Sequence, residues 1–75
     1  MRVEPILLKH KRYNYLPTQF LWRGVAHQVH KIERVWSARG WYRKPPRNYF
    51  RVRCHDNQVL NIFQDVRLNA WYVER

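Results

Sequence analysis

One segment decides the fold of this 75-residue chain: Phe20-Leu21-Trp22-Arg23-Gly24. Phe20 and Trp22 are two positions apart, so they share one face of an extended strand while Leu21 takes the other. Gly24 tolerates the backbone angles that a tight turn needs. We therefore interpret the segment as a strand and a turn, which begin the central hairpin of a small antiparallel β domain.

The return segment from Val25 to Trp36 allows two interpretations. Val25, Val29, Ile32 and Trp36 have the spacing of one helix face, and a glycine at position 40 would suit a helix C-cap. No capping residue stands before Val25, however, and positions 25, 27 and 29 also alternate as a strand would. A bulge at 30–31 would return Ile32 to the inner face. We favour a long, bent strand, and the helix remains the alternative.

Short strands flank this hairpin. The apolar triplet 6–8 predicts a first strand that continues as basic residues 9–12, with a turn or strand end at 13–16 that Pro17 closes. Residues 37–48 form a loop in which 41–43 is a candidate short strand. Strands at 49–55 and 59–63 flank a hairpin turn at Asp56-Asn57, and 70–73 is the closing strand after a polar turn at 65–69.

We therefore expect an all-β fold: a single domain over residues 1–75 whose five to six short strands form an antiparallel sheet that closes towards a barrel. Closure would remove the exposed edges that an open sheet has to protect. Trp22, Trp36 and Trp71 are the predicted core tryptophans. Trp41 is either a cap on the barrel end or an exposed ring.

The composition of the chain limits the class of protein to which it can belong. No apolar run approaches the ~20 residues of a membrane helix. Pro5 and charged residues lie where a signal peptide would have its apolar block. Cys54 is the single cysteine, which argues against a secreted disulfide scaffold. We expect a cytoplasmic protein without a membrane partner.

The charge is large and unevenly distributed. The net charge is +10, and residues 20–53 hold nine basic residues against one acidic residue. Such a concentration suits a polyanion such as nucleic acid, or an acidic protein surface. A charge that serves solubility alone is the remaining alternative.

No catalytic set is evident. Cys54 precedes His55, but neighbours on a strand face opposite sides, so Cys54 is predicted to be a core thiol. Zinc could use His27, His30, Cys54 and His55, yet a single cysteine without a second nearby is a weak pattern for structural zinc. We expect no enzyme, no cofactor and no metal.

Basic and aromatic residues gather around the strand at 49–55. Tyr49, Arg51 and Arg53 alternate onto its outer face. Arginine grips phosphates and stacks on bases, and aromatic rings stack on single-stranded bases. The candidate nucleic-acid-binding residues are Arg39, Trp41, Arg43, Lys44, Arg47, Tyr49, Arg51 and Arg53.

Several of these residues fall in a longer pattern: Phe20-x-Trp22-Arg23-Gly24, Val29-x-x-Ile32-x-x-x-Trp36, Gly40-Trp41, Pro46-Arg47-x-Tyr49-Phe50-Arg51-Val52, Asp65 and Trp71-Tyr72-Val73-Glu74-Arg75. Over residues 17–75 the chain resembles a family of small tryptophan-rich bacterial domains of unknown function, while residues 1–16 match more loosely. Such domains stand alone or are encoded near Y-family translesion DNA polymerases. The resemblance implies a compact β fold and a DNA-repair setting, and it brings no catalytic residues.

The sequence thus leaves two hypotheses for function. The first is a non-catalytic accessory module that binds nucleic acid, DNA rather than RNA, in DNA repair or translesion synthesis. The second is a protein–protein interaction module that binds a polymerase or another repair factor through an exposed sheet edge or the Trp41 patch.

Overall fold

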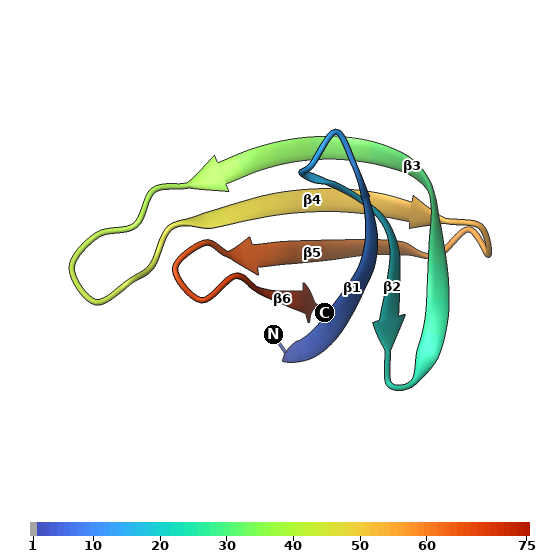
Figure 1. Ribbon diagram of the computed structural model, residues 1–75, viewed down its shortest axis with the longest axis horizontal. Coiled ribbons are helices and arrows are strands. Elements are labelled where there is room, and N and C mark those ends of the chain that lie inside the picture. Colours follow the sequence, from blue (N-terminus) through green and yellow to red (C-terminus); the bar gives the residue numbers. More distant parts are fainter. Residues whose placement is uncertain (1) are drawn as a thin grey trace.

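Six antiparallel strands account for most of the computed structural model, which describes residues 2–75 (Figure 1). They are β1 (Val3–Arg12), β2 (Leu16–Trp22), β3 (Val25–Ala38), β4 (Arg47–Cys54), β5 (Val59–Asp65) and β6 (Ala70–Glu74). Each strand pairs with the next, and β1 pairs with β6, so the sheet closes into a barrel. The predicted all-β fold is confirmed, and residues 2–75 contain no helix.

The predicted turn lies between β2 and β3. Arg23 and Gly24 both have positive φ, +54° and +76°, and Trp22 pairs with Val25. Two central residues with positive φ define a type I′ turn, whose twist matches that of the flanking strands. The Arg-Gly step therefore fixes the register in which Phe20 and Trp22 enter the core.

β3 is one long, bent strand, as predicted, and the helix alternative is wrong. Its pairing with β4 slips between Val29 and Lys31, where a bulge was expected, and slips again between Ile32 and Arg34. Each bulge adds one residue to the strand and increases its local twist. Two bulges let fourteen residues of β3 cross from β2 to the far end of β4.

The second bulge overturns the prediction that Trp36 is a core residue. A single bulge would leave Ile32 and Trp36 on the same face, because they are four positions apart. The extra slip turns Trp36 outwards, where it pairs with Tyr49, and puts Val35 opposite the buried Phe50. The predictions for Trp22 and Trp71 are confirmed, with exposed fractions of 6% and 7%.

Two boundaries also differ from the prediction. Pro17 does not end the first hairpin turn: it lies inside β2, buried, opposite Lys11. Residues 41–43 form no strand, because Trp41 and Lys44 pair only with each other across a tight turn. A bridge of one residue pair reverses the chain without adding to the barrel.

The core is built from alternate residues of β2, β4, β5 and β6, and partly buried apolar side chains of β1 and β3 pack against it. Phe20, Phe50, Val52, Ile62 and Val73 are almost completely buried. Phe50 stacks on Trp71 with ring centroids 5.5 Å apart. Because a largely buried aromatic ring covers roughly 150–250 Å², each is worth a few kcal/mol at ~25 cal/mol per Å².

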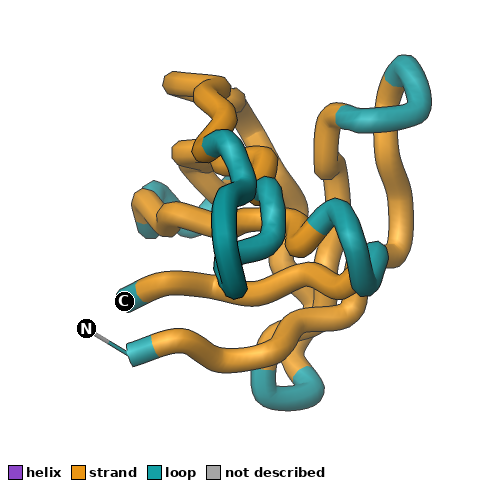
Figure 2. The backbone as a smooth tube through the Cα atoms, turned by 90° about the vertical axis from the view of Figure 1, so that its left-hand side faces the viewer, coloured by secondary structure: helices purple, strands orange, loops and turns teal. Residues whose placement is uncertain are grey.

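Two hairpins extend beyond the closed part of the barrel. Pairing between β1 and β6 ends at Ile6, and pairing between β2 and β3 ends at Gln28. Beyond those residues β1 and β2 continue as one arm, while β3 and β4 continue as another. Figure 2 shows the β1–β2 hairpin rising on the right, apart from β3 and β4. The barrel is therefore closed at one end and open between two arms at the other.

Candidate nucleic-acid interface

Six of the eight predicted site residues surround one hollow of about 370 Å³ at the end of the β3–β4 arm. Ala38 and Pro45 complete its lining, and no acidic residue is among the described residues that line it. The six residues are Arg39, Trp41, Arg43, Lys44, Arg47 and Tyr49. Four cations and two aromatic rings thus share one concave surface.

The loop that carries this surface is shaped by its own backbone. The Trp41 amide donates to the Lys44 carbonyl at 2.9 Å, and the Lys44 amide donates to the Trp41 carbonyl at 2.6 Å. Gly40 lies so close to Pro46 that a Cβ at position 40 would stand 2.5 Å from the proline ring. The Gly-Trp-Tyr-Arg-Lys-Pro-Pro sequence therefore folds into a narrow tip.

The tip presents two rings to solvent. Trp41 is 71% exposed and Tyr42 is 81% exposed, so Trp41 does not cap the barrel end. The Lys44 amine lies 5.9 Å from the centre of the Trp41 ring, and the Arg43 guanidinium lies 5.3 Å from that of Tyr42. Each exposed ring is thus accompanied by a cation, which the sequence neighbours supply.

Arg47 and Tyr49 join the tip to the outer face of the sheet. Arg47 donates from Nη1 to the Tyr49 hydroxyl at 3.1 Å, and its guanidinium lies 4.4 Å from the centre of the Phe63 ring. This hydrogen bond holds the pKa of Arg47 above its ordinary value. Arg47 is therefore held in place as a charged residue that lines one side of the hollow.

Arg51 and Arg53 are not part of this hollow. Arg51 donates to the Asn61 side chain at 3.1 Å and lines a separate depression near Glu74. Arg53 forms an ion pair with Glu33 at 2.8 Å, which compensates its charge. The structure brings together the first six predicted residues and leaves these two farther along β4.

Sequence reasoning missed an aromatic row on the outer face. Trp36, Tyr49, Phe63 and Tyr72 lie side by side on β3 to β6, with successive ring centroids 5.1, 5.2 and 5.2 Å apart. The Arg34 guanidinium covers Trp36 at 4.8 Å. The signal was present in adjacent apolar pairs such as Tyr49-Phe50, which place one ring on each side of the sheet.

A polar row on the inner face was also missed. The Ser37 hydroxyl donates to Asn48 at 3.1 Å, the Asn48 amide donates to Gln64 at 3.4 Å, and the Gln64 amide donates to Asn69 at 2.7 Å. Ser37, Asn48 and Gln64 follow the alternation of the core residues, so they lie beyond the apolar core at its open end. Sequence alone gives no sign that these four residues meet.

The residues considered for zinc do not gather. Within residues 2–75 no three metal-ligating side chains form a cluster. His30 and His55 meet edge to face at 5.2 Å, while His27 stacks on Phe20 at 5.3 Å. Cys54 is buried, as predicted. Burial is the main cause that raises the pKa of its thiol, and the negative charge of the nearby Asp56 is the second.

A comparison with protein families identifies the family of the chain. Residues 2–73 match the model of the family described as Domain of unknown function (DUF6504), and the chain belongs to that family. Comparisons with curated proteins and with solved structures returned no match. No helix in residues 2–75 is long and apolar enough to cross a membrane.

Proposed function

We propose that this protein is a non-catalytic accessory module that binds single-stranded nucleic acid through the tip of the β3–β4 arm. One observation carries the proposal: Trp41 and Tyr42 are exposed, each has a cation beside it, and four cations surround the adjacent hollow without an acidic neighbour in its lining. Neither ring contributes to the core.

This combination fits the chemistry of a nucleic-acid strand. Arginine and lysine neutralise phosphates, and each neutralised phosphate releases counterions. Exposed rings stack on unpaired bases, at roughly 1–3 kcal/mol for each base. An acidic protein surface would use the cations but would leave the two rings without a comparable partner. DNA is the preferred polymer because the resemblance of residues 17–75 implies a setting in DNA repair or translesion synthesis.

A titration of a fluorescent ten-nucleotide dT oligonucleotide and of a duplex, each at two salt concentrations, tests the proposal. We expect the single strand to bind more tightly than the duplex, with an affinity that falls steeply as salt rises. Trp41→Ala should weaken single-strand binding by about 5- to 150-fold, the equivalent of one lost base stack. Tyr13→Ala is the matched control, because Tyr13 is an equally exposed ring on the other arm. Absence of binding at low salt would refute the function.

The second candidate is a protein-interaction module, which the free edge of β3 favours. Past Gln28 the described pairings of β3 are with β4 alone, and the stretch from Arg34 to Ala38 is regular after the second bulge. Such an edge can accept an added strand, and Arg34 with Arg39 favours an acidic peptide. A pull-down that retains one stoichiometric protein after nuclease treatment would support this function, whereas loss of the protein with nuclease would count against it.

A further inference from the structure

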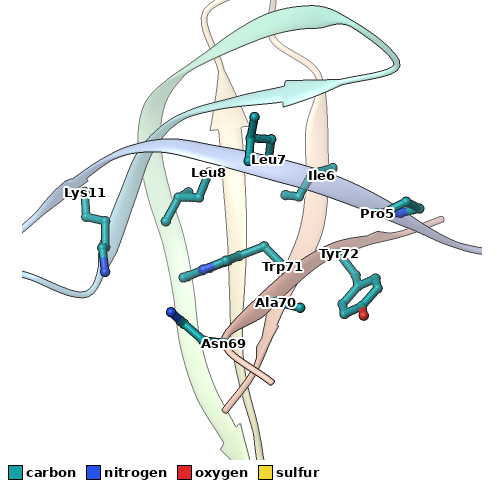
Figure 3. A pocket seen from close by; sticks show the side chains of 9 residues that line it. All are labelled: Pro5, Ile6, Leu7, Leu8, Lys11, Asn69, Ala70, Trp71 and Tyr72. Atoms are coloured by element: carbon teal, nitrogen blue, oxygen red, sulfur yellow. The ribbon is translucent and has the colours of Figure 1, made fainter. Parts of the chain in front are cut away.

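We propose that the cleft between β1 and the start of β6 is a subsite for one unstacked nucleotide of the bound strand. The inference rests on the proposed function and adds to it a second, chemically distinct contact. The cleft has a volume of about 400 Å³ and lies where the β1–β2 arm leaves the barrel (Figure 3).

The topology of the barrel creates the cleft. Ile6 is the last residue of β1 that pairs with β6, opposite Trp71. Leu8 and Lys11 continue along the arm, while the chain before Trp71 turns away into the loop that ends at Asn69. The two segments separate without another strand between them. The resulting floor is apolar, because Ile6 and Leu8 pack against the core beside the indole of Trp71.

Two hydrogen-bond donors stand at the mouth of this apolar slot. Figure 3 shows the Lys11 amine and the Asn69 amide nitrogen on the same side of the cleft, near Leu8 and the indole edge. Lys11 forms no ion pair within the part of the chain that the structure describes. Asn69 is held in the left-handed region at φ +52°, and its Oδ1 accepts a hydrogen bond from Gln64 at 2.7 Å. Its amide hydrogens therefore remain for a ligand.

A nucleotide matches this arrangement better than a purely apolar or a purely ionic ligand. The slot falls within the range of roughly 300–1,000 Å³ that small-ligand sites occupy. An apolar floor suits the face of a base, the Lys11 ammonium suits its phosphate, and the Asn69 amide suits a base carbonyl. A base inside a duplex cannot enter, since it would first have to leave its stack. The subsite therefore makes the module selective for single strands.

The inner polar row connects the tip of the β3–β4 arm with the cleft. It runs from Ser37, next to the β3–β4 tip, to Asn69 at the cleft. A strand held at the tip can thus reach the cleft along a surface that offers side-chain amides. Single β modules that bind single strands contact about 4–16 nucleotides, so one strand is expected to contact more than one part of such a module.

Three variants that each lower the net charge by one test the subsite. Lys11→Gln removes the cation at the cleft. Asn69→Asp keeps the acceptor for Gln64 and tolerance of positive φ, but it removes the donor. Lys9→Gln is the control, because Lys9 is exposed on the same strand and does not line the cleft. The probe is the ten-nucleotide dT oligonucleotide at constant salt, and thermal unfolding establishes that each variant is folded.

We expect Lys11→Gln and Asn69→Asp to raise the Kd by about 5-fold or more, and Lys9→Gln to raise it by no more than about 2-fold. Equal effects of all three variants would overturn the subsite while leaving the proposed function intact, since only net charge would then matter. A wild-type protein that binds no oligonucleotide would overturn both. A further test uses an oligonucleotide with one abasic position. The subsite is supported if this position weakens binding to the wild-type protein as much as Asn69→Asp does, and does not weaken binding to Asn69→Asp any further.

Discussion

Replacement of Arg43 by Asn should change stability and nucleic-acid binding in opposite directions. Arg43 is at the β3–β4 tip with φ +67°, in the left-handed region. A side chain other than Gly, Asn or Asp costs roughly 1–2 kcal/mol there. Asn tolerates this conformation, and the chain already uses it at Asn14, Asn57 and Asn69, all with positive φ. The substitution therefore removes strain together with a guanidinium.

The expected gain in stability is small. Asn should recover about 1 kcal/mol of backbone strain. The variant loses the interaction between Arg43 and the Tyr42 ring, which is worth about 0.5–1 kcal/mol at an exposed site. The net change is a stabilisation of about 0–0.5 kcal/mol. For a domain of this size that corresponds to a rise in Tm of up to about 4 °C.

The expected loss in binding appears in the salt dependence. If Arg43 contacts one phosphate of a single strand, the slope of log K against log salt should become shallower by about 0.7. Anisotropy titrations at four salt concentrations and calorimetric melting of the same preparations give both quantities. Tyr13→Asn is the matched control, because Tyr13 has φ +53° at the other hairpin tip and carries no charge. It should raise the Tm and leave the salt slope unchanged.

Two results would refute this reasoning. A salt slope that stays the same in Arg43→Asn means that the tip does not contact phosphate. A lower Tm in Tyr13→Asn means that the positive φ values do not represent strain that Asn relieves. Each result concerns a different step, so the assay separates an error about the interface from an error about the backbone.

Three further predictions concern the loop, the charges and the thiol. Gly40→Ala should lower the free energy of unfolding by about 1–3 kcal/mol, because its Cβ would meet Pro46 at 2.5 Å; urea titration measures this. The hydrogen bond from Arg23 lowers the pKa of Glu4, so this pair stabilises the fold above the unfolded-state pKa of Glu4 and loses its effect as the pH falls through the folded-state value. The Tm difference between wild type and Glu4→Gln should therefore shrink in acid, and a constant difference would contradict the coupling. Burial raises the pKa of the Cys54 thiol, so a disulfide reagent at pH 8 should label native protein far more slowly than unfolded protein.

The sequence predicts the barrel because local signals agree over most of its length. The Phe20-x-Trp22 spacing, the Arg-Gly turn and the alternation of β4 each act between near neighbours in the chain. The second bulge of β3 has no such signal. It depends on how β3 must twist to pair with β2 at one end and with β4 at the other, which is a property of the closed barrel. Trp36 was consequently placed on the wrong face.

The site could be predicted only in part for a similar reason. The cations and rings of the β3–β4 tip are close in sequence, so any tight loop brings them together around one hollow. The cleft joins Lys11 to Asn69, and no local pattern connects residues so far apart. Arg53 lies on the outer face of β4 as predicted, but its charge is compensated by Glu33 on the neighbouring strand. The sequence gives no sign of this ion pair.

The exposed rings at the tip are informative because stability gives no reason for them. The inner face of the sheet is filled by a core around Phe50, and the outer face by the aromatic row from Trp36 to Tyr72. Both faces of β4 and β5 are therefore already packed, and neither needs another ring. Trp41 and Tyr42 lie beyond both faces, in a turn where Arg43 has positive φ, and both side chains are largely exposed to solvent. Two large exposed rings surrounded by cations fit a ligand that is flat and negatively charged, which is the kind of ligand that the proposed function requires.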